Sequence, residues 1–239
     1  MSDRQPSPDP ASFGAAVRDE GFRFGGSRSQ WFALQCVVLG QIAVGALIAR
    51  SPGADAQFAG VLLTQLIAGV SGTVAGTTAP LRQTSLRSYW ARACVWGGLF
   101  AVATAVGIGL TTLAMNPVLA PWGLDIRLDS PDEFRRLCGA CFFVAASAGA
   151  GVSIGVLLRH RVSAVMVTLG WLLVIPVTVA LAEPSAGSTW LLLLPSAGMW
   201  SFISFGGESA AIPAAVSMLL WAGAGIGATA LLLQRRVRT

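Results

Sequence analysis

Few side chains in this 239-residue sequence are of the types that perform catalysis or bind metals. Cys138 and Cys141 have the Cys-x-x-Cys spacing, but no second pair and no nearby histidine completes a metal site. The one histidine, His160, lies between Arg159 and Arg161. We interpret the cysteines as small apolar residues and His160 as a cation beside a membrane. We therefore expect no catalytic residue, no metal site and no cofactor.

Acidic side chains gather in one stretch, at Asp125, Asp129, Asp132 and Glu133. An integral membrane enzyme would need such a cluster, yet no base or metal ligand accompanies it. All 16 basic residues are arginine, so a Gly-x-x-x-x-Gly-Lys-Ser/Thr phosphate-binding loop cannot occur. We expect that the chain is not an enzyme and that any ATP it uses is hydrolysed on a separate subunit.

The composition predicts an all-α membrane protein. Hydrophobic residues make up 54% of the chain and charged residues 11%, against about 25% charged residues in soluble domains. Six apolar segments approach the ~20 residues that cross a bilayer as a helix. They span approximately 31–49, 57–79, 93–115, 137–158, 162–182 and 212–233 of the transmembrane domain 31–239. None of them contains Asp, Glu, Lys or Arg, whereas ion-driven transporters place such groups within their spans.

Two segments precede the first span. Residues 1–10 hold three prolines and predict a disordered tail. Residues 11–30 place Phe13, Val17 and Phe24 near helical spacing among charged residues, which is typical of a helix lying on a membrane surface. The glycines of this segment leave a poorly ordered leader open as the alternative.

The distribution of arginine predicts both termini on the cytoplasmic side of a bacterial plasma membrane. Most arginines then fall in inner segments: Arg4, Arg18, Arg23, Arg28, Arg82, Arg87, Arg92, Arg159, Arg161, Arg235, Arg236 and Arg238. Outside, Pro131 and Glu133 predict a helix start that continues into the fourth span. A broken apolar run around Pro195 and Gly198 predicts a re-entrant hairpin before the last span. Gly72 with Gly76, and Gly151 with Gly155, have the spacing that lets helices approach closely in lipid.

The segment between the second and third spans, Pro80–Arg92, combines arginines with apolar and aromatic residues; we call it the connector. Such a segment can lie on the membrane surface and offer charge and apolar contacts to a soluble partner. We expect an ATPase to dock there through Leu81, Arg82, Leu86, Arg87 and Tyr89. The alternative is a solvated loop that follows the usual basic bias of inner loops.

Taken together, this layout resembles the membrane permease subunit of a type-2 ABC (ATP-binding cassette) exporter, over about residues 13–238. The resemblance implies that Glu20, Arg23 and Arg28 belong to an elbow helix and that the connector carries the coupling helix. It also implies a separate ATP-binding subunit and a homodimer, or a pairing with a similar permease. The sequence that leads into the connector departs from the family, because Ala75–Arg82 lacks the glutamate of its Glu-Tyr-Arg-Thr-Gly-like motif.

A different class of function stays open. The chain could be a non-transporting membrane assembly or immunity factor that packs against the spans of a partner. No nucleic-acid partner is expected for either class.

Overall fold

The computed structural model describes residues 12–48, 58, 60–78, 86–119 and 131–174, with residues 216, 220, 223, 225 and 227–231 near the carboxyl terminus. These residues form helices and no strands. The described helices are α1 (Phe13–Gly25), α2 (Arg28–Ile48), α3 (Val61–Thr77), α4 (Leu86–Leu119), α5 (Pro131–Leu158) and α6 (Arg161–Leu169), with a π-helical turn, η3 (Gly170–Val174), after α6.

Three of these helices are long and apolar enough to cross a membrane, over Arg28–Leu47, Leu86–Pro117 and Pro131–Leu158. Shorter apolar helices cover Val61–Thr77 and Arg161–Val174. The prediction of an all-helical fold is confirmed, while six spans remain a prediction. The proposed hairpin at Pro195 and Gly198 and the tail 1–10 lie outside the described residues.

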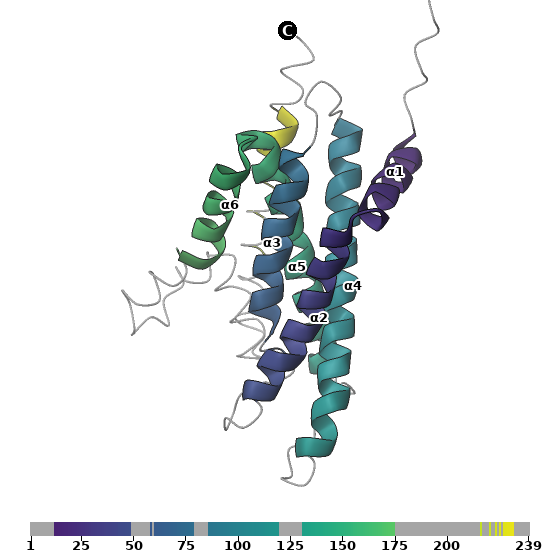
Figure 1. The fold of residues 1–239 in the computed structure, drawn as a ribbon, viewed down its shortest axis with the longest axis vertical. Helices are drawn as coiled ribbons and strands as arrows, with labels where there is room; N and C mark the ends of the chain where they lie inside the picture. The colour runs from purple at the N-terminus through teal and green to yellow at the C-terminus, as the bar shows by residue number, and fades with distance from the viewer. Residues whose placement is uncertain are drawn as a thin grey trace, which may run out of the picture.

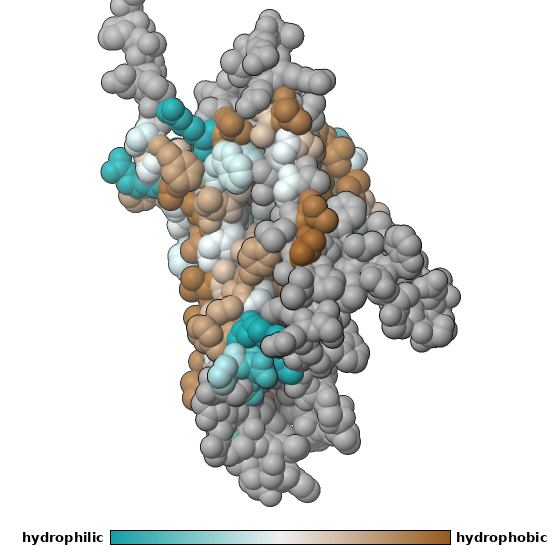
Figure 2. Space-filling view, turned by 180° about the vertical axis from the view of Figure 1, so that it is seen from behind, coloured by the Kyte–Doolittle hydropathy of each residue, from teal (hydrophilic) through white to brown (hydrophobic). Residues whose placement is uncertain are grey.

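The helices alternate in direction along the bundle (Figure 1). The start of α2, the end of α3, the start of α4, the end of α5 and the start of α6 meet at one end, where α1 also lies; we call it the connector end. Several of the arginines predicted to be on the inner side lie at this end, among them Arg28, Arg87 and Arg161. Figure 2 shows hydrophilic side chains gathered toward the two ends of one face, with apolar side chains along its length between them.

The centre of the bundle is the contact between α3 and α5. A Cβ built on Gly72 would overlap the carbonyl oxygen of Ala148, and one on Gly151 would overlap that of Gly69. Only helices without side chains at these positions can approach so closely. The two predicted glycine pairs therefore lie against each other, one on each helix.

Hydroxyl groups inside the apolar helices bond to the carbonyl four residues earlier, as Thr104 does to Phe100 at 2.7 Å and Ser147 to Phe143 at 2.9 Å. This local bond satisfies the hydroxyl group within the apolar surroundings of the helices. A smaller number also bond between helices, including Gln65 Nε2 to Ser147 Oγ at 2.9 Å and Thr73 to Thr168 at 2.7 Å. These contacts join α3 to both α5 and α6.

Two helices begin six or seven residues before their predicted spans. Helix α4 begins at Leu86, seven residues before the predicted start at 93, so the second half of the connector is helical. Helix α5 begins at Pro131, as the sequence indicated, and runs without a break to Leu158. The turn to α6 is as short as expected: Arg159 has φ 58° and ends α5 in the left-handed conformation.

Candidate coupling site

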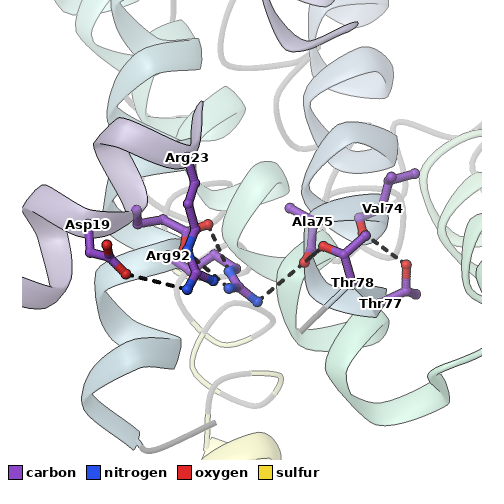
Figure 3. A network of polar contacts seen from close by, with 8 residues as sticks. Asp19, Arg23, Val74, Ala75, Thr77, Thr78 and Arg92 are labelled. Carbon is purple, nitrogen blue, oxygen red and sulfur yellow. Dashed lines mark hydrogen bonds and ion pairs between the residues drawn. The ribbon is translucent and has the colours of Figure 1, made fainter. Parts of the chain in front are cut away.

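A buried ion pair joins α1 to α4 at the connector end (Figure 3). Arg92 Nε lies 2.8 Å from Glu20 Oε1, and Arg92 Nη2 lies 3.1 Å from Glu20 Oε2. The two side chains are only 6% and 11% exposed. This is the two-pronged geometry in which a guanidinium holds a carboxylate most strongly.

The same guanidinium also contacts α3. Its Nη1 donates to the carbonyl oxygen of Ala75 at 3.3 Å, which lies in the last turn of α3 (Figure 3). The carbonyl groups of a last helical turn lack partners within the helix and carry partial negative charge, which a cation stabilises. Arg92 therefore links three helices: it pairs with α1, belongs to α4 and stabilises the end of α3.

Aromatic packing reinforces the contact of α1 with α4. Phe24, 3% exposed, packs edge-on against Trp96 with ring centroids 5.0 Å apart, and against Trp31 at 6.2 Å. Trp96 in turn stacks on Phe100 at 6.1 Å. Because Glu20 and Phe24 lie one turn apart, the ion pair and the aromatic cluster fix the same face of α1.

Helix α1 itself is a well-formed local structure. The hydroxyl of Ser12 accepts a hydrogen bond from the backbone nitrogen of Ala15 at 3.3 Å and caps the helix start. The helix ends at Gly25, so the Gly25-Gly26 pair terminates it instead of weakening its interior. Arg23 pairs with Asp19 at 3.4 Å on the exposed side. The residues Glu20 and Arg23 therefore belong to α1, whereas Arg28 begins α2.

The proposed docking residues separate into different environments. Leu81 and Arg82 lie outside the described residues. Arg87 is exposed, and Leu86 is partly buried against the core. Tyr89 is 1% exposed, because α4 turns it into the bundle. As placed, Tyr89 cannot be a direct docking contact, which corrects that part of the prediction.

Tyr89 bonds within the bundle instead. Its hydroxyl lies 2.6 Å from Ser153 Oγ on α5, and Thr229 is also within hydrogen-bonding reach. Trp90, 38% exposed, lies next to Arg87 on the accessible surface of the first turn. The first two turns of α4 thus present Arg87 and Trp90 outward, and Tyr89 and Arg92 inward.

Sequence reasoning missed the pairing of Glu20 with Arg92. A helical signal was present, because Tyr89, Arg92, Trp96 and Phe100 recur at three- and four-residue intervals and all four are buried.

In the described parts of the chain, no group of three or more His, Cys, Asp or Glu side chains could hold a metal ion. Comparison with family models, curated proteins and solved structures finds no match to this chain.

Proposed function

We propose that this chain is the transmembrane permease subunit of an ATP-driven exporter. It forms part of a translocation path and takes its free energy from a separate ATP-binding subunit that docks at the connector end. Two permeases, either two copies of this chain or this chain with a similar one, make up the complete path. The likeness of the sequence layout to type-2 exporters motivates the proposal.

The observation that carries it is the junction around Arg92. A partner that moves the connector moves the start of α4, since the second half of the connector is the first two turns of that helix. Arg92 passes that displacement to Glu20 on α1 and to Ala75 on α3. Tyr89 passes it to Ser153 on α5. One short segment is thus bonded directly to three other helices.

The distribution of charge supports the same proposal. In the described parts of α2 to α6, each Asp, Glu and Arg lies within the first two turns of its helix. Proton- and ion-driven carriers place such groups at the depth of the membrane to bind the driving ion. The described helices offer no such ion path, so coupling to an external ATPase is the simpler source of work.

The test is co-purification with an ABC ATPase, which is sought first in the reading frames that neighbour this chain. The double substitution Arg82→Glu and Arg87→Glu reverses two charges of the connector and should abolish co-purification without unfolding the bundle. The matched control is Arg159→Glu with Arg161→Glu, which makes the same charge change in a different turn of the same end. Unchanged co-purification of the connector variant would exclude this docking site. If this chain performs its biological role fully in a preparation that contains no ATPase, that result would favour the alternative, a non-transporting assembly or immunity factor.

A further inference from the structure

We propose that a cavity between α5, α6 and η3 binds the apolar chain of an anionic amphiphile, whose head group contacts the turn between α5 and α6. This inference rests on the proposed function, because it names the class of molecule that the permease would carry.

The cavity has a volume of about 630 Å³, within the range of about 300–1,000 Å³ typical of small-molecule sites. Its walls come from α5, α6, η3 and Gly225 near the carboxyl terminus. Ile154 and Leu157 line it on α5, Met166 on α6, and Trp171 on η3. These side chains are hydrocarbon, thioether and aromatic surface, which favours an occupant without polar groups at this depth.

The hydroxyl in the wall is already engaged. Ser153 donates to the carbonyl oxygen of Gly149 at 3.0 Å and lies 2.6 Å from the hydroxyl of Tyr89. An occupant that needed hydrogen bonds from this wall would have to compete with both contacts. A hydrocarbon chain has no such requirement.

Arginine side chains lie at the turn that joins α5 to α6, the two helices that line the cavity. Leu157 lines the cavity, and Arg159 follows two residues later. Both Arg159 and Arg161 are exposed, and within the described part of the chain neither is paired with a carboxylate. A phosphate or carboxylate head group on the occupant would complement them.

The cavity is accessible from the side of the bundle. Among its lining residues, Met166 is 64% exposed, Val167 49% and Val174 53%. Figure 1 shows α6 at the edge of the described bundle. In a bilayer, this side would face the acyl chains, so an apolar chain could enter laterally while its head group stayed near the arginines.

Occupancy would also be communicated to the coupling site. Ser153 in the cavity wall bonds to Tyr89, which lies three residues before Arg92 on α4. A ligand that shifts Ser153 therefore acts on the helix that continues from the connector. This gives a physical route by which cargo could change the rate of ATP hydrolysis.

Binding can be measured on the full chain alone, in nanodiscs, by quenching of Trp171 fluorescence. The probes are phosphatidylglycerol and phosphatidylcholine with the same dibrominated chain, and the Trp171→Phe variant supplies the background from other tryptophans. We expect phosphatidylglycerol to bind more tightly by about fivefold for each arginine engaged, as for cations at a membrane surface. Arg159→Gln with Arg161→Gln should remove that preference. Equal quenching by both lipids in the unchanged chain would overturn the head-group assignment.

Gly170→Leu tests the cavity itself. A Cβ at Gly170, which lines the cavity, meets nothing within 4 Å, so a leucine enters open space. Gly98→Leu on α4 is the matched control, because its Cβ also meets nothing within 4 Å and Gly98 is exposed and outside the cavity lining. We expect Gly170→Leu to lower quenching by at least half and Gly98→Leu to leave it unchanged. Equal quenching in the two variants would overturn the site. The arginine variants test the head-group contact even if Gly170→Leu fails to fold.

A second measurement separates cargo from resident lipid. In the complex with the ATPase, lysophosphatidylglycerol should stimulate ATP hydrolysis at least twofold, and Gly170→Leu should abolish that stimulation. Binding without stimulation would show a resident lipid and overturn the assignment as cargo. If no ATPase co-purifies, the proposed function fails, while the quenching experiments on the chain alone still decide whether the site binds the amphiphile.

Discussion

Replacing Arg92 with methionine removes the cation that compensates Glu20 and leaves a carboxylate only 11% exposed. Breaking a buried ion pair from one side costs about 3–5 kcal/mol, so we expect Arg92→Met to lower the free energy of unfolding by that amount. Glu20→Leu should cost a similar amount, since it leaves the guanidinium buried. The double variant should recover most of the loss, because two apolar side chains then meet beside Phe24 and Trp96. The carbonyl oxygen of Ala75 also accepts a hydrogen bond from Thr78 Oγ1 at 2.9 Å, so we expect it to stay bonded when Arg92 is replaced.

The measurement is a double-mutant cycle on the purified chain in mixed micelles, with unfolding by sodium dodecyl sulfate followed by tryptophan fluorescence. The interaction term of the cycle isolates the contact from the separate effects of each substitution. A term of about 3 kcal/mol or more supports the pair as the structure places it. If the two single losses simply add, Glu20 and Arg92 do not act on each other and α1 is not tied to α4 in this way.

Two further predictions concern the helix contacts. Gly72→Ala places a methyl group against the Ala148 carbonyl and should lower the free energy of unfolding by about 1–3 kcal/mol. The control Gly98→Ala has open space around it and should be neutral or stabilising by up to about 1 kcal/mol. Equal effects of the two variants in the same unfolding assay would contradict the close approach of α3 and α5. Tyr89→Phe removes the bond to Ser153 and should cost about 1 kcal/mol; a stabilised variant would show that this hydroxyl is not bonded inside the bundle.

The sequence was informative where a local pattern determines the structure. Proline at the first helical position predicted the start of α5 at Pro131, because its fixed φ and missing donor suit that position. Glycines four residues apart predicted surfaces for close packing, and Gly72 and Gly151 do pack at the contact of α3 with α5. Neither prediction depended on knowing which helices are neighbours.

The candidate coupling site depends on knowing which helices are neighbours, so it could not be derived from local patterns. Glu20 and Arg92 are 72 residues apart in the chain, and each was interpreted as a surface charge of its own segment. Tyr89 was expected at the surface because the whole connector, up to residue 92, was placed on the membrane surface outside the predicted spans. The extra helical turns of α4, which rotate Tyr89 and Arg92 inward, are stabilised by tertiary contacts with α1, α3 and α5.

The glycine contact between α3 and α5 constrains how the protein can change shape. With backbone against backbone and no intervening side chains, these two helices have no compressible layer that would let one slide past the other. These two helices must therefore move together as one rigid body. In any opening motion, the helices packed around this pair are the ones that move relative to it. Among those described, α2 and α6 carry exposed apolar side chains, such as Leu39 and Met166.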